Sequence, residues 1–329
     1  MIVLGVETSC DETAAAICSD GFILSSIVSS QLIHSEFGGV VPELASREHE
    51  LFLNSIVHKA IQKAGIKKTD IEGIAVTRGP GLAGALLAGA CFSKGFAQGL
   101  DTPIIGINHL EAHIFANFLA DPNLEFPFVC LLVSGGHTQL WLVERLGGYT
   151  LLGSSRDDAA GEAFDKGARI LGLGYPGGPE IEECAKGGNQ KAVDFPRAFI
   201  NNKNIEFSFS GLKTALLYYM DTYENNTFIT KADISASYQQ AIVDVLVTKL
   251  KQAVADTAVK TCVIAGGVAA NKSLRRTMND SMKDIRVLYP DLTLCTDNGA
   301  MVAYLGELYL TQGVSSAMDF DIDPNLKLA

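Results

Sequence analysis

Two short segments, about half a chain apart, share one pattern of residues. The first runs Leu4-Gly5-Val6-Glu7-Thr8-Ser9-Cys10-Asp11-Glu12-Thr13, and the second runs Leu131-Leu132-Val133-Ser134-Gly135-Gly136-His137-Thr138-Gln139-Leu140. In each, an apolar run leads into small hydroxylated or glycine residues, and a second apolar run follows. This pattern predicts a β-hairpin whose turn offers backbone N–H groups and hydroxyls to phosphate oxygens. The repetition indicates a duplicated domain that grips a phosphate compound, although two ordinary hairpins would give the same pattern.

The remaining sequence alternates strand and helix patterns, which predicts α/β architecture. Strands are expected at 2–9, 22–30, 71–77, 103–107, 128–133, 139–143 and 261–265. Helices are expected at 43–64, 159–171, 233–258, 272–282 and 300–310, with another in the Ala-rich run that ends at Gln98. Residues 172–179 are expected to form a loop, and the polar tail from Val314 is expected to pack loosely.

Bulk properties are those of a well-cored globular enzyme. The 329 residues suffice for two domains of ordinary size, and 47% of them are hydrophobic. We predict no membrane helix, because no apolar stretch approaches the roughly 18 residues that one needs. The seven cysteines are odd in number and include no Cys-x-x-Cys pair, which favours buried thiols and a cytoplasmic protein.

The chain is acidic, with 26 Lys and Arg against 37 Asp and Glu, a net charge of −11. Phosphate neutralisation dominates the affinity of proteins for nucleic acids, so an acidic protein is a poor general binder of them. A nucleic-acid substrate would therefore need local basic patches or a partner protein. One basic run exists at Lys59, Lys63, Lys67 and Lys68, although such runs are more often solvated helix surface.

His109 and His113 stand four residues apart, which on a helix places both imidazoles on one face as in many metal sites. Glu111 would face away from them, so the sequence does not favour a zincin-type metalloprotease. Asp297 is the first candidate for a third ligand. It also precedes a predicted helix, where it could act as an N-cap instead.

Further polar residues near predicted turns are candidate ligand contacts. Asn271 follows the glycine turn Gly266-Gly267 and could bind a base or ribose or cap the next helix. Asp165 could accept hydrogen bonds from ribose hydroxyls, and the segment Gly174 to Pro179 suits a binding loop. The segment Phe207 to Lys213 could line a cleft or form an edge strand.

Together these motifs resemble, essentially from end to end, the bacterial tRNA N6-adenosine threonylcarbamoyltransferase family, once called O-sialoglycoprotein endopeptidases. The resemblance is carried by the two hairpin motifs, His109 to His113, Gly161 to Lys166, Tyr175 to Pro179, Phe209 to Lys213, Gly266 to Asn271 and Thr296 to Gly299.

The resemblance implies the actin-like ATPase fold, two duplicated α/β subdomains around a nucleotide cleft. We expect the first subdomain at 1–107, with a C-terminal helix at 298–329 packing back on it, and the second at 108–297. The resemblance also implies His109, His113 and Asp297 as ligands of a divalent iron or zinc ion. It implies that Leu132, Val133, Ser134, Gly135, Gly136, Asp165, Gly178, Glu182 and Asn271 contact an adenine nucleotide that forms part of the substrate.

The activity implied is threonylcarbamoyl transfer from threonylcarbamoyl-adenylate to N6 of the adenosine 3′ of the anticodon, in tRNAs that read codons starting with A. Asp11 or Glu12 could orient or deprotonate the attacking amine. The implied partners are tRNA, a catalytically silent paralogue in a heterodimer, a small P-loop ATPase and a separate synthase that supplies the donor. An actin-fold small-molecule kinase and a non-catalytic nucleotide-binding scaffold are the alternatives, and the His109/His113 pair disfavours both.

Overall fold

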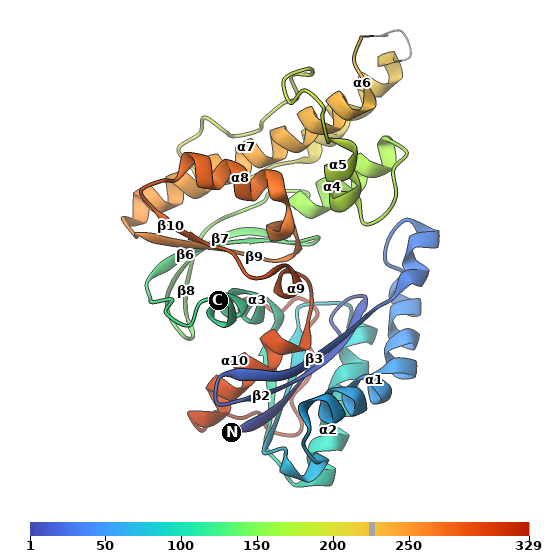
Figure 1. The fold of residues 1–329 in the computed structure, drawn as a ribbon, viewed down its shortest axis with the longest axis vertical. Helices are drawn as coiled ribbons and strands as arrows, with labels where there is room; N and C mark the ends of the chain where they lie inside the picture. Colours follow the sequence, from blue (N-terminus) through green and yellow to red (C-terminus); the bar gives the residue numbers. More distant parts are fainter. Residues whose placement is uncertain (224–227, 329) are drawn as a thin grey trace. The chain divides into compact units, whose positions relative to one another are not determined.

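The computed structural model describes residues 1–223 and 228–328, which form two compact units (Figure 1). One unit comprises residues 1–123 and 290–328, and the other comprises residues 124–289. The unit boundaries thus fall after residues 123 and 289, whereas the sequence placed them after 107 and 297. The reason is α3 (His109–Ala120), which packs against α10 (Gly299–Thr311) and belongs with the first unit.

The first unit is built on a five-stranded sheet in the order β3-β2-β1-β4-β5. β1 (Ile2–Glu7), β2 (Glu12–Ser19) and β3 (Phe22–Ser30) form an antiparallel meander. β4 (Gly73–Gly79) and β5 (Ile104–Asn108) continue the sheet in parallel on the other side of β1.

The second unit repeats this topology in its own sheet, in the order β10-β9-β6-β7-β8. β6 (Phe128–Val133), β7 (Thr138–Arg145) and β8 (Gly148–Ser154) form the antiparallel meander. β9 (Thr261–Ala265) and β10 (Arg286–Leu288) add in parallel beside β6. The predicted duplication is confirmed, because each hairpin motif forms the first two strands of an equivalent sheet.

Helices cover both faces of the first sheet. Successive side chains of β2 point to opposite faces, and those on both faces are buried. Ala15 and Ile17 point into a core shared with α1 (Pro42–Ala64) and α2 (Ala83–Leu100), whereas Ala16 and Cys18 pack against α10. A Cβ on Gly5 would lie 2.3 Å from the backbone nitrogen of Ala303. Glycine at this position in β1 therefore lets α10 approach the sheet closely.

The helices of the second unit position the predicted ligand contacts. They are α4 (Ala160–Ile170), α5 (Gly177–Cys184), α6 (Ser210–Tyr223), α7 (Lys231–Thr257) and α8 (Lys272–Ser281). A capping box between Thr230 and Asp233 starts α7. The buried Tyr238 of α7 then donates a hydrogen bond to the Ala163 carbonyl of α4 at 2.8 Å. This contact fixes α4 against α7.

Short elements complete the fold. They are the 3₁₀ turns at Leu32–Phe37, Lys68–Asp70 and Gly267–Ala270 and the one-turn helix α9 (Leu292–Cys295). No helix among residues 1–223 and 228–328 is both long enough and apolar enough to span a bilayer.

Two expectations for the fold are wrong, and a third is right in part. Residues 177–179 begin α5 rather than ending a loop. In the segment Phe207 to Lys213, α6 begins at Ser210, but Phe207 forms a parallel β-bridge with Ser155, as an edge strand would. The last helix ends at Thr311, so residues 314–328 are not helical. They are not loosely packed either. This tail is held by backbone hydrogen bonds from Ser316 to Ile104, from Asp323 to Arg78 and from Gly81 to Pro324.

Candidate functional site

His109 and His113 lie where β5 runs directly into α3. The side chain of Asn108 caps this helix by accepting hydrogen bonds from the backbone N–H groups of Leu110 and Glu111. The cap fixes His109 as the first helical residue, and His113 follows one turn later. Their rings meet edge to face with centroids 4.6 Å apart, so both imidazoles lie on one face as predicted.

Asp297 reaches the two histidines from the segment between α9 and α10. Its Oδ1 lies 3.0 Å from His113 Nε2 and 3.5 Å from His109 Nε2. It does not cap α10, because Asn298 does so by accepting a hydrogen bond from the Met301 N–H at 3.0 Å. Asn298 therefore leaves the Asp297 carboxylate available to the histidines.

The geometry of this trio fits a divalent metal ion. One donor atom from each of His109, His113 and Asp297 lies within 4.8 Å of the others. Tetrahedral ligands at about 2.0–2.1 Å from a metal are roughly 3.3 Å apart, which is close to the two distances seen here. Two imidazoles and a carboxylate suit zinc or iron.

A buried carboxylate that we did not predict as a site residue supports His109. Glu7, at the end of β1, places Oε2 3.2 Å from His109 Nδ1 and accepts hydrogen bonds from Thr77 Oγ1 and from the Ser9 N–H. A carboxylate on the far nitrogen of a ligating histidine fixes the ring and directs the other nitrogen to the metal. The sequence signal for Glu7 is an acidic residue that ends an otherwise apolar strand.

Charges at this cluster shift the protonation of its members. Burial disfavours the charged form of His109, but Asp297 and Glu7 outweigh it and raise its pKa from 6.5 to about 9. Burial likewise opposes ionisation of Glu7, but His109 and Thr77 hold its pKa below its ordinary value. Without a bound cation, His109 is therefore an imidazolium at neutral pH, and a metal must displace its proton.

Asp11 and Glu12 lie on the β1–β2 turn and at the start of β2, in the same unit as the histidines. Burial, together with the carboxylates of Asp297, Asp11 and Glu7, raises the pKa of Glu12 to about 10. A neutral Glu12 donates a proton more readily than it accepts one. Burial also raises the pKa of the adjacent Cys10 thiol, which argues against a nucleophilic role for that residue.

The predicted phosphate turn lies in the second unit, after β6. The side chains of Leu132 and Val133 are fully buried, so they can meet a ligand only through their backbone. The turn is closed by a hydrogen bond from the Ser134 N–H to the His137 carbonyl at 2.8 Å. A Cβ on Gly135 or Gly136 would meet nothing within 4 Å, so the backbone there is open to a ligand.

Two other glycines hold this turn by close packing. A Cβ on Gly161, in the first turn of α4, would lie 2.5 Å from the Ser134 carbonyl oxygen. A Cβ on Gly266, whose φ is +88°, would lie 2.5 Å from the carbonyl oxygen of Val133. The N-terminus of α4 therefore abuts the turn, where its dipole favours an anion.

The other predicted contacts gather on α4, α5 and α8. Asp165 Oδ1 accepts the Gly177 N–H at 2.7 Å, and Glu182 Oε1 accepts the Lys272 N–H at 2.6 Å. Asn271 caps α8 through the Leu274 N–H and donates to Gln239 Oε1 at 2.8 Å. The capping alternative for Asn271 is thus confirmed, and Gln239 is a neighbour that we did not predict.

A pocket of about 660 Å³ opens beside these residues, within the size range of small-molecule sites. Its walls come from α5, α7, α8 and the segment after α5, and they include Pro179, Glu182, Gln239, Lys272 and Arg276. A Cβ on Gly178 would meet nothing within 4 Å. The second unit thus combines an open phosphate-type turn with a pocket that is partly lined by polar groups.

The duplicated topology defines the class of protein. Solved structures with the same arrangement include HypF in its phosphate- and nucleotide-bound form, with a TM-score of 0.63 and 14% identity over 96% of this chain and 47% of that one. They also include component A of the Acidaminococcus fermentans (R)-2-hydroxyglutaryl-CoA dehydratase, with a TM-score of 0.54 and 15% identity over 93% and 97% of the two chains. These similarities show the actin-like ATPase fold.

Sequence comparison gives the family. The model of the family TsaD, tRNA N6-adenosine threonylcarbamoyltransferase, matches residues 22–304. Proteins of that name from Clostridium perfringens (strain SM101) and Thermosipho africanus are each 50% identical to this chain. The first match covers 99% of this chain and 98% of the relative, and the second covers both completely. The chain belongs to the tRNA N6-adenosine threonylcarbamoyltransferase family.

Proposed function

We propose that the chain transfers a threonylcarbamoyl group from threonylcarbamoyl-adenylate to N6 of the adenosine 3′-adjacent to the anticodon, in tRNAs that read codons starting with A. The bond from the amine nitrogen to the carbamoyl carbon forms, the bond from that carbon to the phosphate oxygen breaks, and AMP and a proton leave. The observation that carries the proposal is full-length similarity to the family at 50% identity.

The second unit would bind the adenylate part of the donor. The phosphate fits the open backbone at Ser134, Gly135 and Gly136, and N–H donors there would stabilise the charge that develops on the leaving AMP. The nucleoside fits the pocket beside Gly178 and Glu182. Asp165 and Asn271 would shape this site rather than reach far into it, because each already holds a helix start.

The first unit would hold one divalent iron or zinc ion on His109, His113 and Asp297. When bound, such an ion supplies Lewis acidity and a template for substrate oxygens. Glu7 would keep the ring of His109 in its ligating orientation. Asp11 would orient the attacking amine, and Glu12, with its raised pKa, would hold a proton near it.

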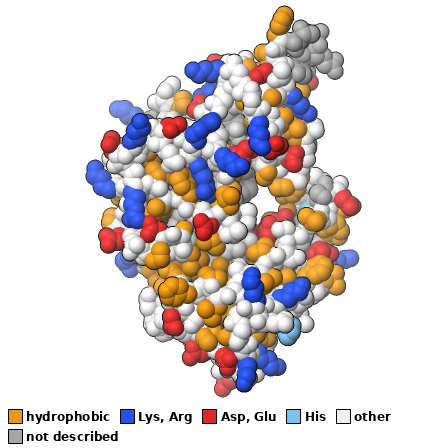
Figure 2. All heavy atoms as spheres, in the orientation of Figure 1, with side chains coloured by type: hydrophobic (Ala, Val, Ile, Leu, Met, Phe, Trp, Pro, Cys, Tyr) orange, Lys and Arg blue, Asp and Glu red, His pale blue; other side chains and the backbone are white. Residues whose placement is uncertain are grey.

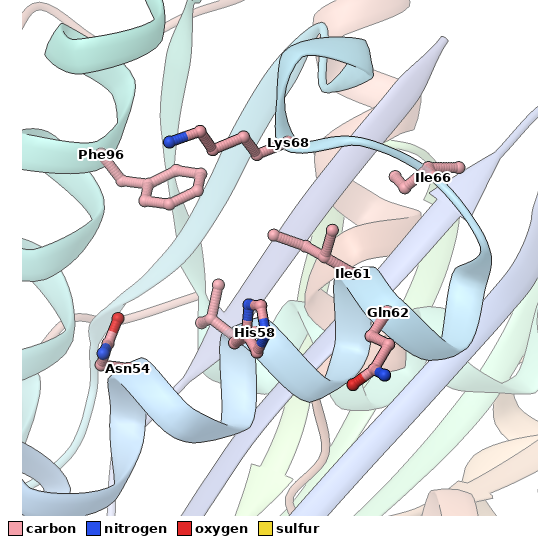
Figure 3. Close-up of a pocket in the computed structure, with 8 residues that line it drawn as sticks. Asn54, His58, Ile61, Gln62, Ile66, Lys68 and Phe96 are labelled. Carbon is pink, nitrogen blue, oxygen red and sulfur yellow. The ribbon is translucent and has the colours of Figure 1, made fainter.

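Partners would complete the cycle in the cytoplasm. A synthase would supply the donor, a catalytically silent paralogue would form a heterodimer with this chain, and a small P-loop ATPase would reset it. Exposed apolar side chains on α1 and α2 support a protein partner, since Leu51 is 70% exposed and Leu87 51%. Between these helices lies an open pocket of about 530 Å³, around which Ile61, Ile66 and Phe96 gather (Figure 3).

The test is transfer of labelled threonine from threonylcarbamoyl-adenylate to unmodified tRNA, with the presumed partner proteins added. We expect transfer by the wild-type chain, loss of it in His109→Ala, and normal activity in Lys251→Ala, whose lysine is exposed on α7 and lines neither pocket. Metal content and circular dichroism would distinguish ion loss from unfolding. Absence of transfer with every partner combination, despite AMP binding, would refute the proposed reaction.

A further inference from the structure

The net charge of the chain is confined to one of its two units. The first unit carries eight Lys and Arg residues against nineteen Asp and Glu, whereas the second carries eighteen of each. The entire charge of −11 therefore belongs to the first unit. Because a polyanion is repelled by such a surface, the neutral second unit is the favoured side for RNA.

Within the second unit, cations concentrate on and around α8. Residues 272–286 include five Lys and Arg residues and two Asp residues. In Figure 2, Lys and Arg side chains are numerous over the surface where Figure 1 places α8. Four exposed cations here, which we term the basic strip, make no ion pair among the described residues: Lys260, Lys272, Arg276 and Lys283.

The local structure brings the members of the strip together. Lys272 and Arg276 are four residues apart on α8, so they share one helix face. Tyr289 ties α8 to the segment after β10, because its hydroxyl bonds Asn279 Oδ1 at 2.8 Å and its ring faces the Arg275 guanidinium. Lys260 joins this region because its carbonyl accepts the Arg286 N–H at 2.9 Å.

Three other cations of the same unit are paired with nearby carboxylates. Arg156 pairs with Glu206 at 2.7 Å, Lys166 with Asp158 at 2.7 Å, and Arg197 with Asp244 at 2.7 Å. The strip also borders the proposed donor pocket, since Lys272 and Arg276 line it together with Glu182. Cations that bind an acceptor backbone here would therefore hold it close to the donor.

We propose that the basic strip binds the phosphate backbone of the tRNA acceptor, an inference that rests on the proposed function. Lysines on flexible stems contact phosphates as point charges and carry no base readout, so the strip would position tRNA without selecting its sequence. Selection of the target adenosine would then fall to other residues or to a partner.

The test compares two triple variants of the full chain, with and without the presumed partners. Lys260→Ala/Arg276→Ala/Lys283→Ala removes three strip cations and keeps Lys272. Because Arg276 also lines the donor pocket, the Kd for AMP shows whether this variant affects donor binding. Lys59→Ala/Lys63→Ala/Lys67→Ala makes the same change in charge on exposed positions of the first unit. The measurements are the Kd for unmodified tRNA from 50 to 200 mM salt and, separately, the Kd for AMP.

We expect the strip variant to bind tRNA at least about tenfold more weakly at 0.1 M salt, with a log–log salt slope smaller by about 2–3. The first-unit variant should change the Kd for tRNA less than about twofold. Equal effects of both variants, or tRNA binding that needs a partner and ignores the strip, would overturn the proposal. Failure of the proposed function would appear differently, as tRNA bound normally but not modified by the wild-type chain.

Discussion

Replacing Glu7 by glutamine should weaken the candidate metal centre while leaving its three proposed ligands in place. The glutamine keeps the size of the side chain but removes the negative charge that lies 3.2 Å from His109 Nδ1. It also places a side-chain NH2 group against either the Ser9 N–H or the Thr77 hydroxyl, each of which donates to Glu7 in the wild type. The variant thus tests whether the buried carboxylate serves the histidine or only the local fold.

The size of the effect follows from the pKa of His109. A rise from 6.5 to about 9 corresponds to about 3.4 kcal/mol of preference for the imidazolium form. Asp297 and Glu7 both raise this pKa, Glu7 through its charge and its hydrogen bond, so removing the charge of Glu7 should forfeit roughly 1–2 kcal/mol, or about tenfold in proton affinity. Loss of the carboxylate beside a ligating histidine typically costs about 10–100-fold in metal affinity.

The pH dependence of stability has a definite sign in the metal-free protein. The pKa of His109 is raised in the folded state. Its contribution to the free energy of unfolding is therefore fully present below pH 6.5 and disappears as the pH rises through about 9. Glu7→Gln should flatten this fall in the free energy of unfolding. Thr77→Val is the matched control, because it removes a hydrogen bond to the same carboxylate and keeps the charge.

The assays are urea unfolding of metal-free protein between pH 6 and 10, NMR titration of His109, and zinc affinity by competition with a chelator. We expect Glu7→Gln to lower both the pKa of His109 and the zinc affinity, and Thr77→Val to change each by a much smaller factor. If Glu7→Gln binds zinc as tightly as the wild type and leaves the pKa of His109 near 9, Glu7 does not support the site.

Three further outcomes are expected. Asp157→Ala should destabilise the chain by about 1–2 kcal/mol in urea unfolding, because Asp157 accepts the Phe209 and Ser210 N–H groups at the start of α6. Burial opposes its ionisation, but these bonds and those from Ser208 and Ser210 hold its pKa low, so its stabilisation should persist at neutral pH and disappear only as acid protonates it. Gly161→Ala should weaken AMP binding at least about tenfold by displacing the Ser134 turn, whereas Gly211→Ala, which meets nothing within 4 Å, should not; equal calorimetric Kd values would contradict this. His49→Leu should cost roughly 2–4 kcal/mol in urea unfolding, because it leaves the Cys10 carbonyl and the Thr13 hydroxyl without a buried partner, and an unchanged midpoint would refute that account.

Sequence reasoning succeeded where the signal is local. Alternating residues and small-residue turns predicted both hairpins, and a four-residue spacing predicted that His109 and His113 share a helix face. Asp297 was the first candidate for a third metal ligand, and the family resemblance implied the same role. In the sequence, a carboxylate before a helix reads equally well as a cap, and only the structure assigns that task to Asn298.

The misses come from contacts between distant segments. The start of α6 is capped by Asp157, which lies more than fifty residues earlier in the sequence. The local sequence around Ser210 therefore does not predict a helix. The tail from Val314 is polar, but its backbone hydrogen bonds to Ile104 and Arg78 hold it in place. Glu7 was not predicted as a site residue because its partner His109 lies about one hundred residues further along the sequence and reaches it only through the placement of β5 and α3.

The two copies of the hairpin differ in charge, which indicates that their turns bind different kinds of ligand. The turn after β1 carries Asp11 and follows the buried carboxylate of Glu7, so it would repel phosphate unless a cation intervened. The turn after β6 carries Gly135 and Gly136 with open backbone and no acidic side chain. One duplicated topology thus carries a candidate cation site in the first unit and a turn open to an anion in the second.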